Sequence, residues 1–278
     1  MIWELRHEFK IGLLIDVAEI PRSTYYYYSK QFSHPKPDKY AEIKAEIRRI
    51  HAECKGRYGY RRIADELKKT RVINYKTVRR LMRKMGIFCR VRMKKYNSYR
   101  GEVGRIAPNL LERNFKADKP NQKMATDVTE FSLFGTKLYL SAMIDLYNGE
   151  IVAYNLSEHP NMHQVIDMLE KAFAKIPDNS NLILHSDQGW QYQHKLYRQM
   201  LKDKGIRQSM SRKGNCLDNA CIENFFGLLK SELLYLQEFS SVEHFIAELH
   251  EYIDWYNNKR IKRRLAGLSP VQFRLNAA

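Results

Sequence analysis

The chain has 278 residues, 44% of them hydrophobic, which leaves room for one large domain or for two or three smaller ones with buried cores. Its 48 Lys and Arg against 31 Asp and Glu give a formal net charge of +17, which favours an acidic partner, although a basic surface can also serve solubility alone. No stretch approaches the roughly 20 consecutive apolar residues of a membrane-spanning helix, so the sequence predicts a globular protein without a membrane partner.

The positive charge is unevenly distributed along the chain. Residues 1–120 carry 30 Lys and Arg against 13 Asp and Glu, whereas residues 121–278 carry 18 of each kind. Binding to nucleic acid depends largely on neutralisation of phosphates by Lys and Arg. The excess therefore directs the search for nucleic-acid contacts to the first part of the chain.

Cysteine usage and the N-terminal residues bear on the cellular compartment. The N-terminal apolar stretch is interrupted by acidic residues and does not fit a secretory signal. The cysteines form no CxxC pair and no Cys/His cluster with zinc spacing. We therefore expect a cytosolic protein with reduced, structurally packed thiols at Cys54, Cys89, Cys216 and Cys221.

Residues 1–32 have the pattern of an N-terminal helical segment. Apolar residues recur with helical spacing through Val17, and a turn at Pro21 precedes the aromatic run YYYY. This arrangement weakly resembles the second half of a helix-turn-helix. The Pro-rich, polar stretch SHPKPDK at 33–39 then predicts a linker.

Residues 40–92 predict a helix-turn-helix DNA-binding domain. Two short amphipathic helices would share a small core made of Ile63, Ala64, Leu67, Val78, Leu81 and Met82. The exposed face of the second helix would present Lys76, Arg79, Arg80, Arg83 and Lys84. A helix-turn-helix places its second helix in the major groove, where basic side chains contact phosphates and base edges. A solvated basic helix in a bundle is the alternative, and the concentrated positive charge favours nucleic acid.

Residues 93–120 lose this periodicity and predict a basic linker, and from residue 121 the pattern is that of strands. The stretches MATDVTEFSLF, KLYLSAMIDLY and EIVAYNL predict three strands, with Gly135 and the pair Asn148–Gly149 in the turns. There follow a helix at 162–176, a strand at 182–184, a helix at 192–204, a short strand in GIRQSM, and helices at 218–235 and 242–256. The sequence predicts an α/β fold, a mixed five-stranded sheet with flanking helices, preceded by a small all-α helix-turn-helix region.

Three carboxylates stand out in this second part. Asp127 lies in the middle of the first strand, Asp187 ends the fourth, and Glu223 lies on the helix that follows, with thirty-five residues between the last two. If the two strands are neighbours, Asp127 and Asp187 converge. Such a set suits hard divalent cations, and two of them can serve an in-line displacement at phosphorus. Each acid by itself is more often a solvated surface residue.

The residues around these acids resemble those of insertion-sequence transposases of the IS3 family, specifically the second-frame (OrfB) product. The resemblance rests on TDVTEF, LHSDQGWQY, SRKGNCLDNACIENFFGLLKSE, the tail WYNNKRIKRRLAGLSPVQFR and the segment GRYGYRRIADEL, and covers about residues 40–275. It implies that residues 121–278 form an RNase H-like, retroviral-integrase-type catalytic core with a C-terminal helical tail. It also implies a DDE triad of Asp127, Asp187 and Glu223 that binds two Mg²⁺ or Mn²⁺ ions.

Further residues carry over as expected DNA contacts. Lys230 follows Glu223 by seven residues and so returns to the same helix face. The resemblance adds Asn219, Arg212 and Lys213. It leaves Arg260 of the tail element YNNKR between a structural and a DNA-contacting role. One departure is Met124, where the family usually has Trp three residues before the first Asp; Met fills core positions adaptably, so we expect the packing to survive.

The turn after Asp187 raises a separate question about its neighbours. Gly189 and Trp190 would shape this turn at the sheet edge, where a metal ligand can meet Asp127 and DNA. His185 lies on an apolar strand, and a histidine there is more often a hydrogen-bonded core residue than a ligand. We therefore expect His185 inside the fold.

The resemblance implies a transposase that cleaves DNA at the ends of its element and joins the freed 3′-OH to a target. The expected partners are terminal inverted repeats and target DNA, further copies of the chain on DNA, and the upstream-frame (OrfA) product or a fusion with it; the expected location is the bacterial cytoplasm, at the nucleoid. One alternative is a second-frame product that binds DNA and regulates transposition without being active alone. A structure-specific nuclease or resolvase on the same fold is disfavoured by the spacing of the acids and by Lys230.

Overall fold

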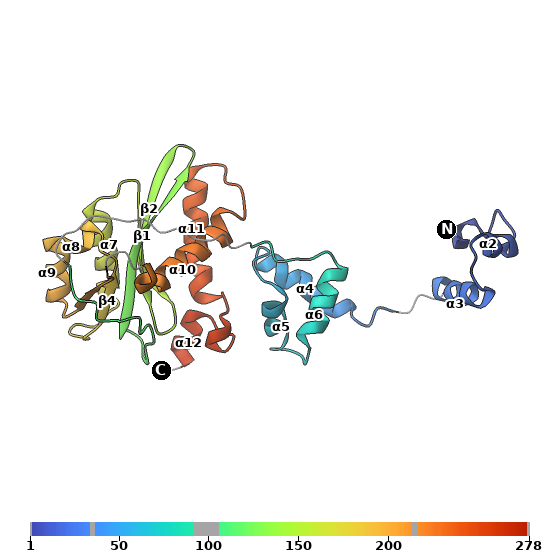
Figure 1. Cartoon of the computed structure of the whole chain (residues 1–278), viewed down its shortest axis with the longest axis horizontal. Helices are drawn as coiled ribbons and strands as arrows, with labels where there is room; N and C mark the ends of the chain where they lie inside the picture. The colour runs from blue at the N-terminus through green and yellow to red at the C-terminus, as the bar shows by residue number, and fades with distance from the viewer. Residues whose placement is uncertain (1, 34–36, 92–105, 213–215, 277–278) are drawn as a thin grey trace. The chain divides into compact units, whose positions relative to one another are not determined.

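The computed structural model describes residues 2–33, 37–91, 106–212 and 216–276 (Figure 1). The chain divides into two compact units, Met1–Arg49 and Ile50–Ala278, and each is described by itself. Within the described ranges, no helix is both long and apolar enough to cross a membrane.

The first unit is helical, as the sequence predicts for residues 1–32. It contains α1 (Ile2–Leu5), α2 (Ile11–Val17) and α3 (Arg22–Ser33), and α4 (Ala41–Glu53) begins in it. Ile15 of α2 and Tyr25 of α3 are buried. The apolar stretch up to Val17 thus lies on α2, and the aromatic run YYYY lies on α3.

In the second unit, the end of α4 is followed by the predicted helix pair, α5 (Tyr60–Leu67) and α6 (Tyr75–Lys84), which pack on each other. The six apolar residues expected to form their core are all buried. Asn74 caps α6, because its side chain accepts a hydrogen bond from the backbone N–H of Lys76. The five basic residues of α6 named above are exposed, so the helix presents one charged face.

A five-stranded mixed sheet forms the centre of the second unit. Its strands are β1 (Lys123–Leu133), β2 (Thr136–Asp145), β3 (Ile151–Ser157), β4 (Ile183–Ser186) and β5 (Arg207–Met210), in the order β3-β2-β1-β4-β5. The strands β1 to β3 pair antiparallel, whereas β4 pairs parallel with both β1 and β5. This topology and the helices around it confirm the predicted fold class.

Helices cover both faces of the sheet, because alternate residues of each strand point to opposite sides. Ala125, Phe131 and Ile183 pack with α10 (Ala220–Leu229) and α11 (Val242–Asn258). Their neighbours Met124 and Leu184 pack on the other face with α7 (Met162–Phe173) and α9 (Lys195–Asp203). Figure 1 shows these two helical layers on either side of β1. The remaining elements are α8 (Trp190–Gln193), η1 (Cys216–Asn219), η2 (Lys230–Leu234), η3 (Arg263–Leu265) and α12 (Pro270–Asn276).

Two helices expected to be continuous are interrupted. The helix predicted over 192–204 breaks at His194, whose side chain caps α9 by accepting a hydrogen bond from the N–H of Leu196. The helix predicted over 218–235 is a 3₁₀ turn, the α-helix α10 and the π-helical turn η2 in succession. Hydrophobic spacing marks a helical stretch but does not distinguish these turn types.

Candidate active site at the ends of strands β1 and β4

The parallel pairing of β1 and β4 brings the first two acids to matching positions. The ladder pairs Lys123 with Ile183 and Ala125 with His185. Two residues further along the same register, Asp127 on β1 corresponds to Asp187, which directly follows β4. Asp127 alternates with Ala125 and Phe131 on the face that α10 covers, and Asp187, just past the end of β4, is close enough for its charge to raise the pKa of Asp127.

The third acid lies on the helix over this face. Glu223 is on the first turn of α10, which packs against β1, and its side chain is half-buried. Burial raises its pKa, and the charge of Asp187 raises it further. The influence of Asp187 places Glu223 in the electrostatic field of the acid pair.

The acids have raised pKa values because they are withdrawn from water and close to one another. Burial, and then the charge of Asp187, raises the pKa of Asp127 well above its usual range, against the lowering effect of the Val128 N–H. Burial likewise raises the pKa of Asp187, while the N–H of Gly189 lowers it. Burial is therefore the first cause of the raised pKa of both carboxyls.

Backbone donors fix the orientation of the first two carboxylates. The N–H of Val128 donates to Asp127 Oδ1 over 2.8 Å, and the N–H of Gly189 donates to Asp187 Oδ1 over 2.8 Å. A Cβ at position 189 would lie 2.9 Å from Asp187 Oδ1 and 2.6 Å from Gln191 Nε2, so a side chain there would displace the ends of these two side chains. The turn after β4 thus closes around the carboxylate, as the expected role of Gly189 implies.

The donor set fits a hard divalent cation in its chemistry. Mg²⁺ and Mn²⁺ prefer carboxylate oxygens, and the three acids supply them. Among the described residues, no group of three His, Cys, Asp or Glu side chains is placed to hold a metal ion as it stands. Like charges favour separation, so a cation would have to draw the three side chains together.

Lys230 is a basic side chain that feels the charge of Asp127. It is half-buried, and its ammonium group lies 5.7 Å from the centre of the Phe131 ring. Burial lowers its pKa, whereas the charges of Glu130 and Asp127 raise it. The seven-residue spacing from Glu223 does therefore return Lys230 to the side of the acids.

The other expected DNA contacts differ in accessibility. Asn219 is 3% exposed, and neither polar atom of its side chain has a hydrogen-bond partner in the protein. The side chain of Arg212 is 57% exposed and forms an ion pair with Asp218. Lys213 lies outside the described residues, and the basic residues of α6 face outward.

Arg260 lies inside the fold, unlike Arg212 and the exposed basic residues of α6. It is 2% exposed and donates to both carboxylate oxygens of Glu232, over 2.8 Å and 2.6 Å. Tyr252 donates to the same carboxylate. Because its buried guanidinium is bonded to Glu232, Arg260 has no access to a DNA phosphate in this fold. Of the two roles left open for it, the structure supports the structural one.

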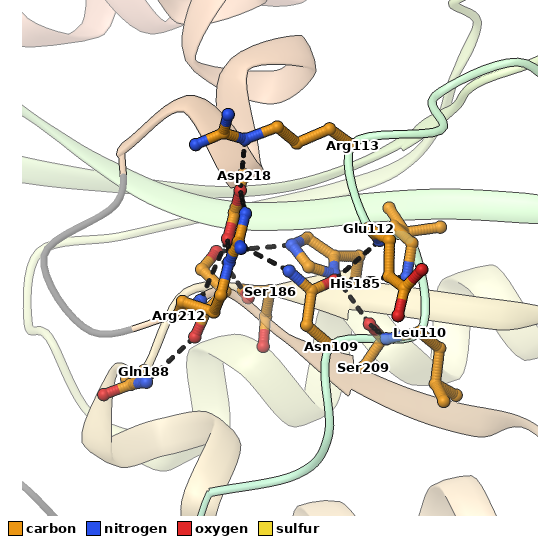
Figure 2. Close-up of polar contacts among 12 residues, drawn as sticks. Asn109, Leu110, Glu112, Arg113, His185, Ser186, Gln188, Ser209, Arg212 and Asp218 are labelled. Atoms are coloured by element: carbon orange, nitrogen blue, oxygen red, sulfur yellow. Dashed lines mark hydrogen bonds and ion pairs between the residues drawn. The ribbon is translucent and has the colours of Figure 1, made fainter.

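A polar cluster beside Asp187 went unnoticed in the sequence (Figure 2). His185 is buried, as expected, with Nδ1 2.8 Å from Ser209 Oγ and Nε2 3.3 Å from Ser211 Oγ. Asp218, 1% exposed, accepts hydrogen bonds from Asn109, Arg113 and Arg212. The only sequence signal for it was an acid five residues before Glu223, and two of its partners, Asn109 and Arg113, lie more than 100 residues away.

Comparisons with known proteins agree with this architecture. The family described as an integrase core domain matches residues 117–216, a second integrase core domain family matches 223–277, and an HTH-like domain family matches 38–95. The chain is 52% identical over 272 residues to the putative transposase InsK for insertion sequence element IS150 of Escherichia coli strain K12, covering 98% of this chain and 95% of the relative.

Two further likenesses are more distant. The chain is 33% identical over 272 residues to the transposase InsF for insertion sequence IS3A of Escherichia coli strain K12, covering 96% of this chain and 94% of that protein. Among solved structures, the HTLV-2 integrase catalytic core domain in complex with magnesium aligns at 15% identity with a TM-score of 0.47, over 56% of this chain and 98% of that one.

Proposed function

This chain belongs to the IS3 family of insertion-sequence transposases, and we propose that it cleaves DNA at the ends of an insertion sequence and transfers the freed 3′-OH to target DNA. The observation that carries the proposal is the register of β1 and β4, which places Asp127 and Asp187 at matching positions under the helix of Glu223. A triad assembled from two strands and a helix can act on a phosphate presented at the strand ends.

Asp127, Asp187 and Glu223 are the residues that would hold a pair of Mg²⁺ or Mn²⁺ ions. When bound, such ions activate the attacking oxygen and stabilise the leaving oxygen of an in-line displacement. The effect of the Asp187 charge on Asp127 and Glu223, whose pKa values it raises after burial, supports this role, because neighbouring negative charges are suited to a cation. The neighbouring backbone N–H groups orient the first two carboxylates for it.

The reaction requires two displacements at phosphorus. In the first, water attacks a phosphodiester at the element end, and the bond to the 3′ oxygen breaks. In the second, this 3′-OH attacks a target phosphate, and the bond to the target's own 3′ oxygen breaks. No covalent bond to the protein forms, so the protein contributes position and charge.

Side chains around the acids would position the DNA. Lys230 supplies a positive charge beside Asp127 for a backbone phosphate. The unpartnered amide of Asn219 is available for a hydrogen bond to a substrate group at the start of α10. Arg212 and Lys213 would add charge near the strand ends, and the exposed face of α6 would bind duplex DNA.

We test the proposal with purified protein, Mg²⁺ and a labelled duplex that bears the terminal repeat of the element. Asp187→Asn and Glu223→Gln should abolish joined products, because each removes a carboxylate but keeps the size of the side chain. Asp203→Asn on α9 and Glu170→Gln on α7 are matched controls with exposed side chains, and they should join DNA as the wild type does.

The outcomes separate the proposal from its rival. Strand transfer that survives in Asp187→Asn or Glu223→Gln would refute the triad. Binding of the repeat without joining, also when copies assemble on paired ends, would support the second-frame product that regulates transposition. Adding the product of the upstream frame would then show whether activity returns.

A further inference from the structure

The carboxylate of Asp218 joins three separate segments of the chain at one buried point (Figure 2). Asn109 donates to Oδ2 over 3.0 Å, and Arg113 Nε donates to Oδ1 over 3.1 Å. Arg212 donates through its backbone N–H, its Nε and one terminal nitrogen, over 3.1, 3.0 and 3.1 Å. Asp218 itself belongs to η1, the turn that leads directly into α10.

The bonds to Arg212 are strong enough to hold this arrangement. The guanidinium contacts both oxygens, which is the two-pronged geometry that arginine and a carboxylate favour. The hydrogen bonds from Arg212, chiefly, keep the pKa of Asp218 well below its usual range. Asp218 is thus an ionised acid inside the protein, in contrast to the three acids of the site, whose pKa values are raised.

The segment before β1 bends at Glu112 and Arg113, next to its contacts with Asp218. Glu112 and Arg113 both have positive φ, 47° and 65°, which is costly for residues other than glycine. Asn109 Oδ1 accepts hydrogen bonds from the N–H groups of Leu111 and Glu112, and this stabilises the bend. Within the expected linker at 93–120, the described residues 106–120 are therefore bonded to the core through Asn109 and Arg113.

The bonds from Arg212 continue to both neighbours of Asp187. Ser211, the residue before Arg212, donates from N and Oγ to the carbonyl oxygen of Ser186 over 2.9 and 3.2 Å. Gln188 Nε2 donates to the carbonyl oxygen of Ser211 over 2.8 Å. The turn that carries Asp187 is thus attached to the residue next to Arg212, and Arg212 is attached to Asp218.

We propose that Asp218 is a positioning residue that fixes the turn of Asp187 relative to the helix of Glu223. Glu223 is the fifth residue after Asp218 on one side, and on the other side the bonds through Arg212 and Ser211 reach the two neighbours of Asp187. The two acids repel each other, and this fastening keeps their backbones in place until a cation neutralises them. The inference rests on the proposed function, since it concerns the same site.

The test measures metal binding directly and needs no DNA. Mn²⁺ is titrated calorimetrically into the full chain and its variants, and thermal unfolding is followed in EDTA. Asp218→Asn should weaken Mn²⁺ binding about tenfold, the lower end of the effect usual for residues that support metal ligands. Arg113→Ala removes one bond and leaves Arg212 in place, so it should weaken binding in the same direction by less.

Controls distinguish positioning from a general loss of stability. Asp203→Asn should bind Mn²⁺ as the wild type does, and Asp187→Asn should not bind it at the site. If Asp218 were merely structural, Asp218→Asn would lower the unfolding temperature and leave the Mn²⁺ affinity of the folded protein unchanged, which would overturn the inference. Should Asp218→Asn not fold, an unchanged affinity in Arg113→Ala would overturn it equally.

The proposed function can fail separately in this experiment. If the wild type took up no Mn²⁺, or if Asp187→Asn took it up equally, the carboxylate triad would not be the metal site and the positioning role would fall with it. Normal wild-type binding, lost in Asp187→Asn and unchanged in folded Asp218→Asn, would refute only the role of Asp218.

Discussion

Asp127 and Asp187 occupy matching positions on neighbouring parallel strands, two residues beyond the last hydrogen-bonded pair of the β1–β4 ladder. Burial and then the charge of Asp187 raise the pKa of Asp127, and burial raises the pKa of Asp187. Ionising these buried carboxyls therefore lowers the stability of the folded protein.

Replacing one of these acids should stabilise the protein in the absence of metal. A carboxyl whose pKa is raised in the fold contributes stability below its unfolded pKa and loses it as the pH rises through the raised value. At pH 7.5 in EDTA, Asp187→Asn should gain about 1 kcal/mol, or roughly 2–4 °C in the unfolding temperature. The gain should vanish near pH 4 or below, where the wild-type acid is protonated too. Equal or lower stability at pH 7.5 would contradict this.

The basic face of α6 should bind DNA phosphates. Lys76→Ala and Arg83→Ala should each weaken binding of any duplex, and each should lower the slope of log affinity against log salt by about one. Fluorescence anisotropy at several salt concentrations measures both effects. Lys202→Ala, which removes an exposed charge on α9, is the control. A slope that falls equally in this control would show that the effect is one of total charge.

Glu232 and Arg260 should stabilise the fold as a pair. Both are 2% exposed, and removing Arg260 leaves buried Glu232 with only Tyr252 and, at 3.9 Å, Arg62, while removing Glu232 takes away the carboxylate partner of buried Arg260. Glu232→Gln and Arg260→Met should each cost about 3–5 kcal/mol in unfolding by urea. The double variant should cost less than the two single variants together. An Arg260→Met protein of normal stability with weakened DNA binding would instead assign Arg260 to DNA.

His185 should make the protein sensitive to acid. Burial lowers its pKa to about 4, whereas the unfolded chain takes up the proton near its ordinary pKa of 6.5. Its contribution to stability is therefore complete above pH 6.5 and is lost as the pH falls toward 4, by up to about 3 kcal/mol. Urea unfolding between pH 7.5 and 4.5 should show this decline in the difference between the wild type and a variant without the imidazole, because the carboxyls with raised pKa values change stability in the opposite direction over this range.

The matched variant is His185→Asn, which can still bond to Ser209 but takes up no proton. It should be less stable than the wild type at pH 7.5, and the difference should shrink on acidification. Identical pH profiles would show that another group controls the response.

Local features of the chain were predictable where local pattern determines them. The turn Asn148–Gly149 joins β2 to β3, with Gly149 at a φ of 74°. Met124 is fully buried against the α7 side of the sheet, so the departure from Trp leaves the packing in place, as expected. The α6 face followed from helical periodicity alone.

Other features could not be predicted because they depend on distant pairings. Arg113 and Asp218 are 105 residues apart, and nothing near either residue indicates the other. Glu232 and Arg260 are 28 apart, and both resemble surface charges in the sequence. The positions of the acids followed from strand and helix patterns, but the shared register of β1 and β4 required the folded sheet.

The π-helical turn from Lys230 to Leu234 follows α10 directly, so one continuous helical stretch carries both Glu223 of the site and Glu232 of the buried ion pair. Ser231, Glu232 and Leu233 are buried in succession, which a single stripe along an α-helix does not provide. The wider turn shifts the angular phase of the helix, so Glu223 on α10 can face the other acids while Glu232, inside the turn, faces Arg260. A substitution that changes the packing of Ser231, Glu232 or Leu233 can therefore be absorbed at the turn, without rotating α10 and moving Glu223 out of the site.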